Sequence, residues 1–97
     1  MAKIGDLVVC TGGAGDYRGD EPIAGIVVSR EDKHPGVFFF RDVRGHDCDG
    51  RAKDGHGWYT DDEDTRVVTD WKERMDILSK HMEEYEEVRK FEVLKNG

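Results

Sequence analysis

The sequence GHDCDGRAKDGHGWY, residues 45–59, places two Gly-His pairs ten residues apart around a polar segment and ends in an aromatic pair. Its glycines and polar residues show no apolar periodicity, which predicts a long loop over residues 42–57. The following Trp-Tyr-Thr, residues 58–60, predicts a short strand. We expect the rest of the chain to support this loop, and no stretch has the form of a catalytic signature.

The most apolar run of the chain lies just before this loop. Residues 37–41, VFFFR, predict a central strand. Because side chains alternate across a strand, Phe38 and Phe40 should lie on one face and Val37 and Phe39 on the other. One face is then core, and the other needs cover that a C-terminal helix can supply.

Four further short runs complete a predicted sheet. Strands are expected at residues 3–10, 23–29, 37–41, 58–60 and 66–68. Gly25 predicts a bulge or sharp bend in the second strand, and Pro35-Gly36 predicts the turn that closes a hairpin over residues 30–36. Residues 11–22 should form a long surface loop. Five short strands with Gly-rich turns predict a small barrel or sandwich.

A long amphipathic helix is predicted from Asp70 to Lys90, a segment without Gly or Pro. Asp70 and Glu73 have the spacing of an N-cap and its capping-box partner. One helix face carries an apolar stripe, Trp71, Met75, Leu78, Met82 and Tyr85, which Val88 and Phe91 continue with slight drift. We expect the stripe to pack on the barrel, with homodimerisation through it as the alternative. The chain is thus one domain, with a barrel at residues 1–69 and a helix at 70–97.

Composition limits the classes of partner. The 97 residues contain 22 Asp and Glu against 15 Lys and Arg, a net charge of −7 that repels nucleic-acid phosphates. No run approaches the roughly 18 apolar residues of a membrane span, and the start of the chain lacks an apolar signal region. With only Cys10 and Cys48, which are expected as free thiols, the sequence predicts a cytoplasmic protein that binds neither membrane nor nucleic acid directly.

A metal site is the most specific hypothesis for the loop. His46, Cys48 and His56 are side chains of the kind zinc favours, and the fold could add Cys10 as a fourth. The sequence lacks the local C-x-x-C or H-x(3–5)-H pair of most zinc modules. We therefore favour a structural role, in which the histidines and loop carboxylates hydrogen-bond backbone groups, and expect no cofactor.

Nucleophilic catalysis by Cys48 with His46 or His56 is the corresponding enzymatic hypothesis. Asp47 and Asp49 beside the thiol should raise its pKa by disfavouring the thiolate. No other catalytic element accompanies it, so we predict that the protein is not an enzyme.

Aromatic and acidic residues are the candidates for partner binding. Trp58 and Tyr59 alternate across their strand, so one should be core and the other exposed beside the loop. Two acidic clusters follow, Asp61, Asp62, Glu63 and Asp64, and then Glu83, Glu84, Glu86 and Glu87. If the clusters share one face, they repeat the charge of a nucleic-acid backbone, and a DNA-binding protein becomes a plausible target.

The Gly-His and GHGWY motifs, after a Gly-Asp-Leu-Val strand and a Gly-Ile-Val-Val strand, resemble a group of small SH3-like barrel proteins of bacteriophages. The resemblance covers residues 3–68 and implies a partly open five-stranded barrel; it supplies no catalytic residues. We therefore predict a non-catalytic phage-type protein that binds and modulates or inhibits a host protein, such as a nucleic-acid-binding or defence protein. A zinc-stabilised domain and a nucleic-acid-binding barrel are the alternatives.

Overall fold

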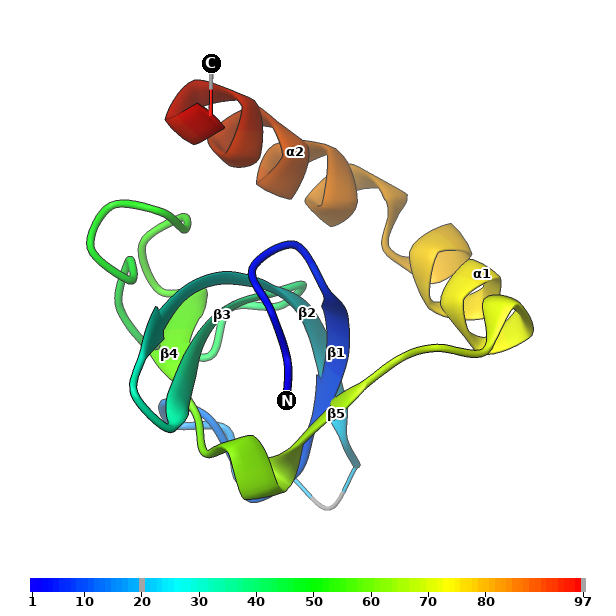
Figure 1. The fold of residues 1–97 in the computed structure, drawn as a ribbon, viewed down its shortest axis with the longest axis horizontal. Coiled ribbons are helices and arrows are strands. Elements are labelled where there is room, and N and C mark those ends of the chain that lie inside the picture. The colour runs from blue at the N-terminus through cyan, green and yellow to red at the C-terminus, as the bar shows by residue number, and fades with distance from the viewer. Residues whose placement is uncertain (20, 97) are drawn as a thin grey trace.

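The computed structural model describes the backbone of residues 1–19 and 21–96 and the side chains of these residues up to Lys90. Five strands form one antiparallel sheet, and helices follow it (Figure 1). The elements are β1 (Leu7–Cys10), β2 (Ile23–Glu31), β3 (His34–Phe39), β4 (Gly57–Tyr59), the 3-10 helix η1 (Asp62–Asp64), β5 (Thr65–Val67), α1 (Trp71–Lys80) and α2 (Met82–Asn96). The predicted mainly β class with C-terminal helical structure is confirmed.

The sheet is curved but open. Its strand order is β4-β3-β2-β1-β5, so β4 and β5 form the two edges and do not pair with each other. Figure 1 shows the strands bending around the N-terminal segment, whose Ala2 is buried with the sheet's inner residues. A curved five-stranded antiparallel sheet is therefore established, and a closed barrel is not.

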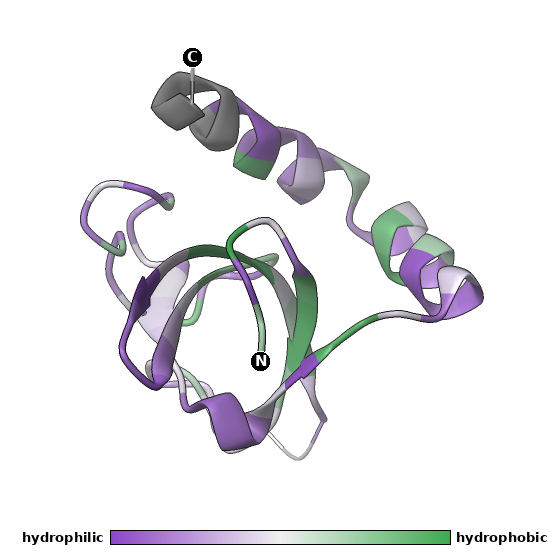
Figure 2. Ribbon diagram, in the orientation of Figure 1, coloured by the Kyte–Doolittle hydropathy of each residue, from purple (hydrophilic) through white to green (hydrophobic). Residues whose placement is uncertain are grey.

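Both faces of β3 are buried, as the alternation of VFFF predicts. Val37 and Phe39 belong to an inner cluster inside the curve, and Phe38 and Phe40 belong to an outer cluster between the sheet and the helices. Phe38 and Phe39 have no exposed surface. Burying each aromatic side chain contributes roughly 2–3 kcal/mol, so β3 stabilises both halves of the fold. Figure 2 shows this apolar character along β1 and β2 as well.

The predicted Pro35-Gly36 turn is wrong, because both residues lie inside β3. β2 and β3 pair from Gly25 opposite Phe39 to Glu31 opposite His34. Residues 32 and 33 make the turn, with Asp32 in the left-handed region at φ 54°. Pro35 still serves the sheet as an acceptor, since its carbonyl receives a hydrogen bond from the Thr60 N–H at 3.0 Å.

Gly25 does not mark a bulge. The register shift between β2 and β3 falls between Val27 and Ser29, and Gly25 pairs regularly with Val8 on one side and Phe39 on the other. A Cβ atom at position 25 would lie 2.5 Å from the Phe38 carbonyl oxygen. Glycine is therefore required by the close approach of β3.

The single long helix is also wrong, because the chain breaks between α1 and α2. His81 leaves the helical conformation at φ −130° and ψ 38°, although the sequence there contains neither Gly nor Pro. Its ring packs against Phe40 of the outer cluster, with ring centroids 5.3 Å apart. At the other end of α1, the Asp70 side chain accepts from the Glu73 N–H at 3.0 Å, as predicted for an N-cap. The reciprocal half of the capping box is replaced by a two-bond pair between Glu73 and Arg66.

The apolar stripe is divided between sheet and solvent. The helical residues that pack on the outer cluster are Ile77, Leu78, Tyr85 and Val88. Trp71, Met75 and Met82 are instead 68%, 58% and 60% exposed. Part of the stripe therefore packs on the sheet through Leu78 and Tyr85, and homodimerisation through the stripe stays a prediction. The predicted continuation at Phe91 and the last residue, 97, lie outside the described side chains.

Candidate functional site

The loop at residues 42–57 is folded back on itself by backbone hydrogen bonds. Gly45 donates to the Gly55 carbonyl at 2.9 Å, and His46 exchanges two bonds with Gly57 at 2.8 and 2.7 Å. Cys48 and Asp49 adopt positive φ angles of 48° and 59°, which non-glycine residues rarely do. The loop is thus a structured part of the fold.

His46 supports this structure directly. Its Nδ1 accepts from the Cys48 N–H at 3.0 Å. Its ring stacks on Tyr59, with centroids 5.6 Å apart, and lies near Trp58 at 5.5 Å. This matches the structural role favoured from the sequence.

His56 lies on the other side of the loop base. The side chain is only 9% exposed, and its Nδ1 donates to the Phe39 carbonyl at 3.0 Å. Because a carbonyl can only accept, Nδ1 carries the proton and Nε2 keeps its lone pair in the neutral ring.

The predicted zinc ligands do not converge. The Cys48 thiol is buried and points toward the Val37 carbonyl at 4.0 Å, while Cys10 belongs to the inner cluster on the opposite face of the sheet. Over the described residues, no group of three His, Cys, Asp or Glu side chains is arranged to hold a metal. The four residues cannot form one site without rearranging the sheet.

Both thiols are poor nucleophiles. Desolvation, followed by the charges of Asp49 and Asp47, raises the pKa of Cys48 to about 12. Burial raises the pKa of Cys10 to about 11, against the opposing effect of its hydrogen bond to Thr65. The predicted direction for Cys48 is confirmed, although the largest cause is burial rather than the neighbouring carboxylates.

The aromatic pair does not divide into one core and one exposed residue. Trp58 and Tyr59 are both partly buried, Trp58 against the inner cluster and Tyr59 against the outer one. The Tyr59 hydroxyl accepts from Ser29 at 2.8 Å and donates to Asp49 at 2.9 Å. Neither residue is therefore fully exposed, and their role in binding a partner stays a prediction.

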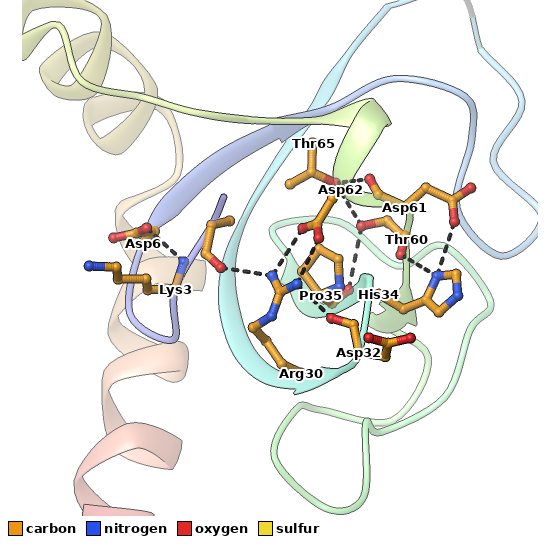
Figure 3. A network of polar contacts seen from close by, with 11 residues as sticks. Lys3, Asp6, Arg30, Asp32, His34, Pro35, Thr60, Asp61, Asp62 and Thr65 are labelled. Atoms are coloured by element: carbon orange, nitrogen blue, oxygen red, sulfur yellow. Dashed lines mark hydrogen bonds and ion pairs between the residues drawn. The ribbon is translucent and has the colours of Figure 1, made fainter.

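Two of the four carboxylates in the acidic turn Asp61–Asp64 pair with basic residues of the β2–β3 hairpin (Figure 3). Arg30 donates to both carboxylate oxygens of Asp62, at 3.0 and 2.7 Å, and also to the Ala2 carbonyl at 2.8 Å. The guanidinium lowers the pKa of Asp62 below its ordinary value. Asp61 pairs with His34 at 3.0 Å. Asp61 and Asp62 thus fasten the acidic turn to the β2–β3 hairpin, and a role of the turn in binding a partner stays a prediction.

The second acidic cluster lies at the other end of the molecule. Glu83, Glu84, Glu86 and Glu87 all belong to the first half of α2, and Figure 1 shows α2 and η1 on opposite sides of the sheet. The two clusters therefore do not share a face. Within the α2 cluster, Glu87 pairs with Lys53 of the loop at 3.7 Å.

The helices leave two grooves beside Phe40 that the sequence did not reveal. One, of about 470 Å³, lies beneath α1 and is bordered by Ile77 and Tyr17. The other, of about 480 Å³, lies between α2 and the loop, and its lining includes Glu84, Lys53 and His56. No local pattern could have predicted them, because each joins Phe40 and Arg41 to helix residues more than 30 positions later in the chain.

Comparison of the chain with models of known protein families, with curated protein sequences and with solved structures finds no match in any of the three. Among the described residues, no helix combines the length and apolar character that crossing a bilayer requires.

Proposed function

We propose that this chain is a non-catalytic protein-binding domain that modulates a partner protein, and that the helical arm α1–α2 carries the binding surface. The observation that supports this most is the exposure of large apolar side chains on the arm. Trp71 is 68% exposed and Met75, one helical turn later, is 58% exposed. Exposed Trp side chains are frequent anchors of protein interfaces.

Different residues of the arm pack on the sheet and face solvent, and this supports the same proposal. Leu78 and Val88 attach the helices to the sheet, so Trp71 and Met75 are not needed to hold the arm in place. Exposing an apolar side chain gives up stabilisation of roughly 2 kcal/mol that burial would provide. A partner that covers Trp71 recovers this free energy.

A non-catalytic role is supported by the state of the reactive side chains. The thiols of Cys10 and Cys48 are buried with raised pKa values, and the ring nitrogens Nδ1 of His46 and His56 are engaged with the backbone. The alternative zinc-stabilised domain gains no support, since no three of the described His, Cys, Asp and Glu side chains are grouped to hold a metal.

We propose that the partner is a host protein with a basic surface and that the two proteins meet in the cytoplasm. We also propose that this chain is of the bacteriophage type that its motifs resemble. The net charge of −7 favours a basic partner and disfavours direct nucleic-acid binding. We also propose that the open curved sheet corresponds to the partly open SH3-like barrel of that group, which the strand order β4-β3-β2-β1-β5 supports.

Affinity capture from a bacterial lysate, followed by mass spectrometry, tests the proposal. We expect one dominant basic partner, whose recovery falls at least about tenfold with Trp71→Ala. Ile4→Ser is the matched control, because Ile4 is 59% exposed but lies outside the arm. Equal loss with both variants, or no enriched basic protein, would contradict the proposal. Trp58→Ala is unsuitable as a probe because that ring packs on the inner cluster.

A further inference from the structure

Another groove, of about 350 Å³, lies between the loop that follows β1 and the segment that follows β3. Its lining comes from residues 16–18 and 41–44, so none of it belongs to the helical arm. Three of the lining residues are exposed arginines, Arg18, Arg41 and Arg44. The volume is near the lower end of the range for ligand pockets, roughly 300–1,000 Å³, and therefore suits a small ligand.

The two walls of this groove are joined by the backbone. The Asp16 N–H donates to the Val43 carbonyl at 2.7 Å, and Val43 is buried in the inner cluster. Gly15 passes so close that a Cβ atom at this position would collide with the same carbonyl. The groove is thus built into the fold, and its arginines are carried by segments that the fold holds together.

Two of the arginines are held in place without a carboxylate. Arg18 Nη1 donates to the carbonyls of Gly15 and Tyr17 at 2.6 and 2.8 Å. The Arg41 guanidinium lies over the Tyr17 ring, 4.5 Å from its centroid. Among the described residues, Nη2 of Arg18 and all the N–H donors of Arg41 have no hydrogen-bond acceptor. Both guanidinium groups therefore keep donors for a ligand.

The lack of ion pairs at these arginines is the observation that points to an anion. Over the part of the chain that the structure describes, the basic members of ion pairs are Arg30, His34, Lys53, Arg66 and Lys80. The three groove arginines have no such partner, although the chain contains 22 acidic residues. Two carboxylates line the groove, Asp16 and Asp42, so three positive charges against two negative ones leave one positive charge in excess.

We infer that this groove binds the phosphate group of a small phosphorylated molecule. A phosphate group offers acceptor oxygens in three directions, whereas a carboxylate offers two in one plane. Arginines that approach from two separate segments therefore match a phosphate better, and the guanidinium fork binds its oxygens in pairs. A nucleic acid would extend beyond the groove over a chain of net charge −7, which favours a compact ligand.

An NMR titration of the purified full chain with inorganic phosphate, glycerol phosphate and adenosine monophosphate tests the inference. We expect saturable shifts of the Nε–H signals of Arg18, Arg41 and Arg44 with each ligand. Acetate should bind at least about fivefold more weakly. Tighter binding of an ester than of phosphate would identify the ester as the ligand, and equal affinities would identify the phosphate group alone as what the groove recognises.

Substitutions of the arginines test the same site. Arg18→Gln combined with Arg44→Gln should weaken phosphate binding about tenfold, because two charged donors are lost. Arg51→Gln is the matched control, since Arg51 is an exposed arginine outside the groove lining, and it should leave the affinity unchanged. Arg44→Lys keeps the charge without the two-bond geometry, so its affinity should lie between those of the wild type and Arg44→Gln. Amide spectra that match the wild type away from the groove establish that each variant is folded.

Three outcomes would overturn the inference: shifts that do not saturate, equal weakening by Arg51→Gln and by the double variant, or equal affinities for acetate and phosphate. Trp71→Ala should not change the phosphate affinity, because the groove shares no residue with the helical arm. Phosphate binding is therefore independent of the proposed function, and failure of either one leaves the other standing.

Discussion

The guanidinium group of Arg30 binds both carboxylate oxygens of Asp62, joining the end of β2 to η1 across 32 positions of sequence. The same guanidinium donates to the carbonyls of Ala2 and Asp32, so one side chain fastens the N-terminal segment, the β2–β3 turn and the acidic turn together. Planar two-bond pairs of this kind are the geometrically specific form of ion pairing.

We expect Asp62→Asn to lower stability at pH 7 and to do so much less in acid. Because Arg30 lowers the pKa of Asp62 in the folded protein, the contribution is fully present above the unfolded pKa of about 3.9 and is lost as pH falls through the folded value. Thermal unfolding from pH 7 to pH 2 should show the wild-type and variant melting temperatures converging. Glu63→Gln, which changes an exposed carboxylate of the same turn, should follow the wild type throughout. A constant difference for Asp62→Asn would contradict the prediction.

We expect Tyr59→Phe to destabilise the fold by about 1–2 kcal/mol, because it leaves the buried Ser29 hydroxyl without its 2.8 Å partner. Urea unfolding measures this free energy. Ser29→Ala together with Tyr59→Phe should cost less than the sum of the single changes, since removing both groups leaves no unpaired donor. Strict additivity would show that the two hydroxyls do not interact.

Val88→Ala should cost about 2 kcal/mol, whereas Trp71→Ser should change stability by no more than about 0.5 kcal/mol. Val88 is 1% exposed in the outer cluster, and Trp71 is 68% exposed. Chemical denaturation of both variants measures the difference. A larger loss of stability for Trp71→Ser would mean that Trp71 packs against the fold and is not exposed to solvent.

Both cysteines should resist thiol reagents in the folded protein. A pKa of about 12 instead of 9.0 at Cys48 lowers its thiolate fraction about a thousandfold at neutral pH, and burial blocks access to Cys10. The folded protein should react slowly with a chromogenic disulfide at pH 8. After denaturation, both thiols should react rapidly. Rapid labelling of one thiol in the native state would restore Cys48 as a candidate nucleophile.

The loop shows how far sequence reasoning reached into the candidate site. The structural role of His46 could be predicted, because polar side chains in Gly-rich loops commonly bond the nearby backbone. The groove beside His56 could not, because its lining joins Phe40, His56 and Glu83, which lie far apart in the sequence. The acidic turn could be predicted as a cluster. Its ion pairs with Arg30 and His34 could not be predicted, because these two residues lie in a distant hairpin.

Local pattern alone determined the mainly β class, the alternation of Val37, Phe38, Phe39 and Phe40 between two cores, and the helix start at Asp70. These features depend on neighbours within a few residues, where backbone geometry dictates direction. Only the tertiary structure decided that Pro35-Gly36 lies within a strand, that the helix breaks at His81, and which half of the apolar stripe is covered. These features depend on how separate elements pair and pack: β2 with β3, His81 with Phe40, and the helices with the outer cluster.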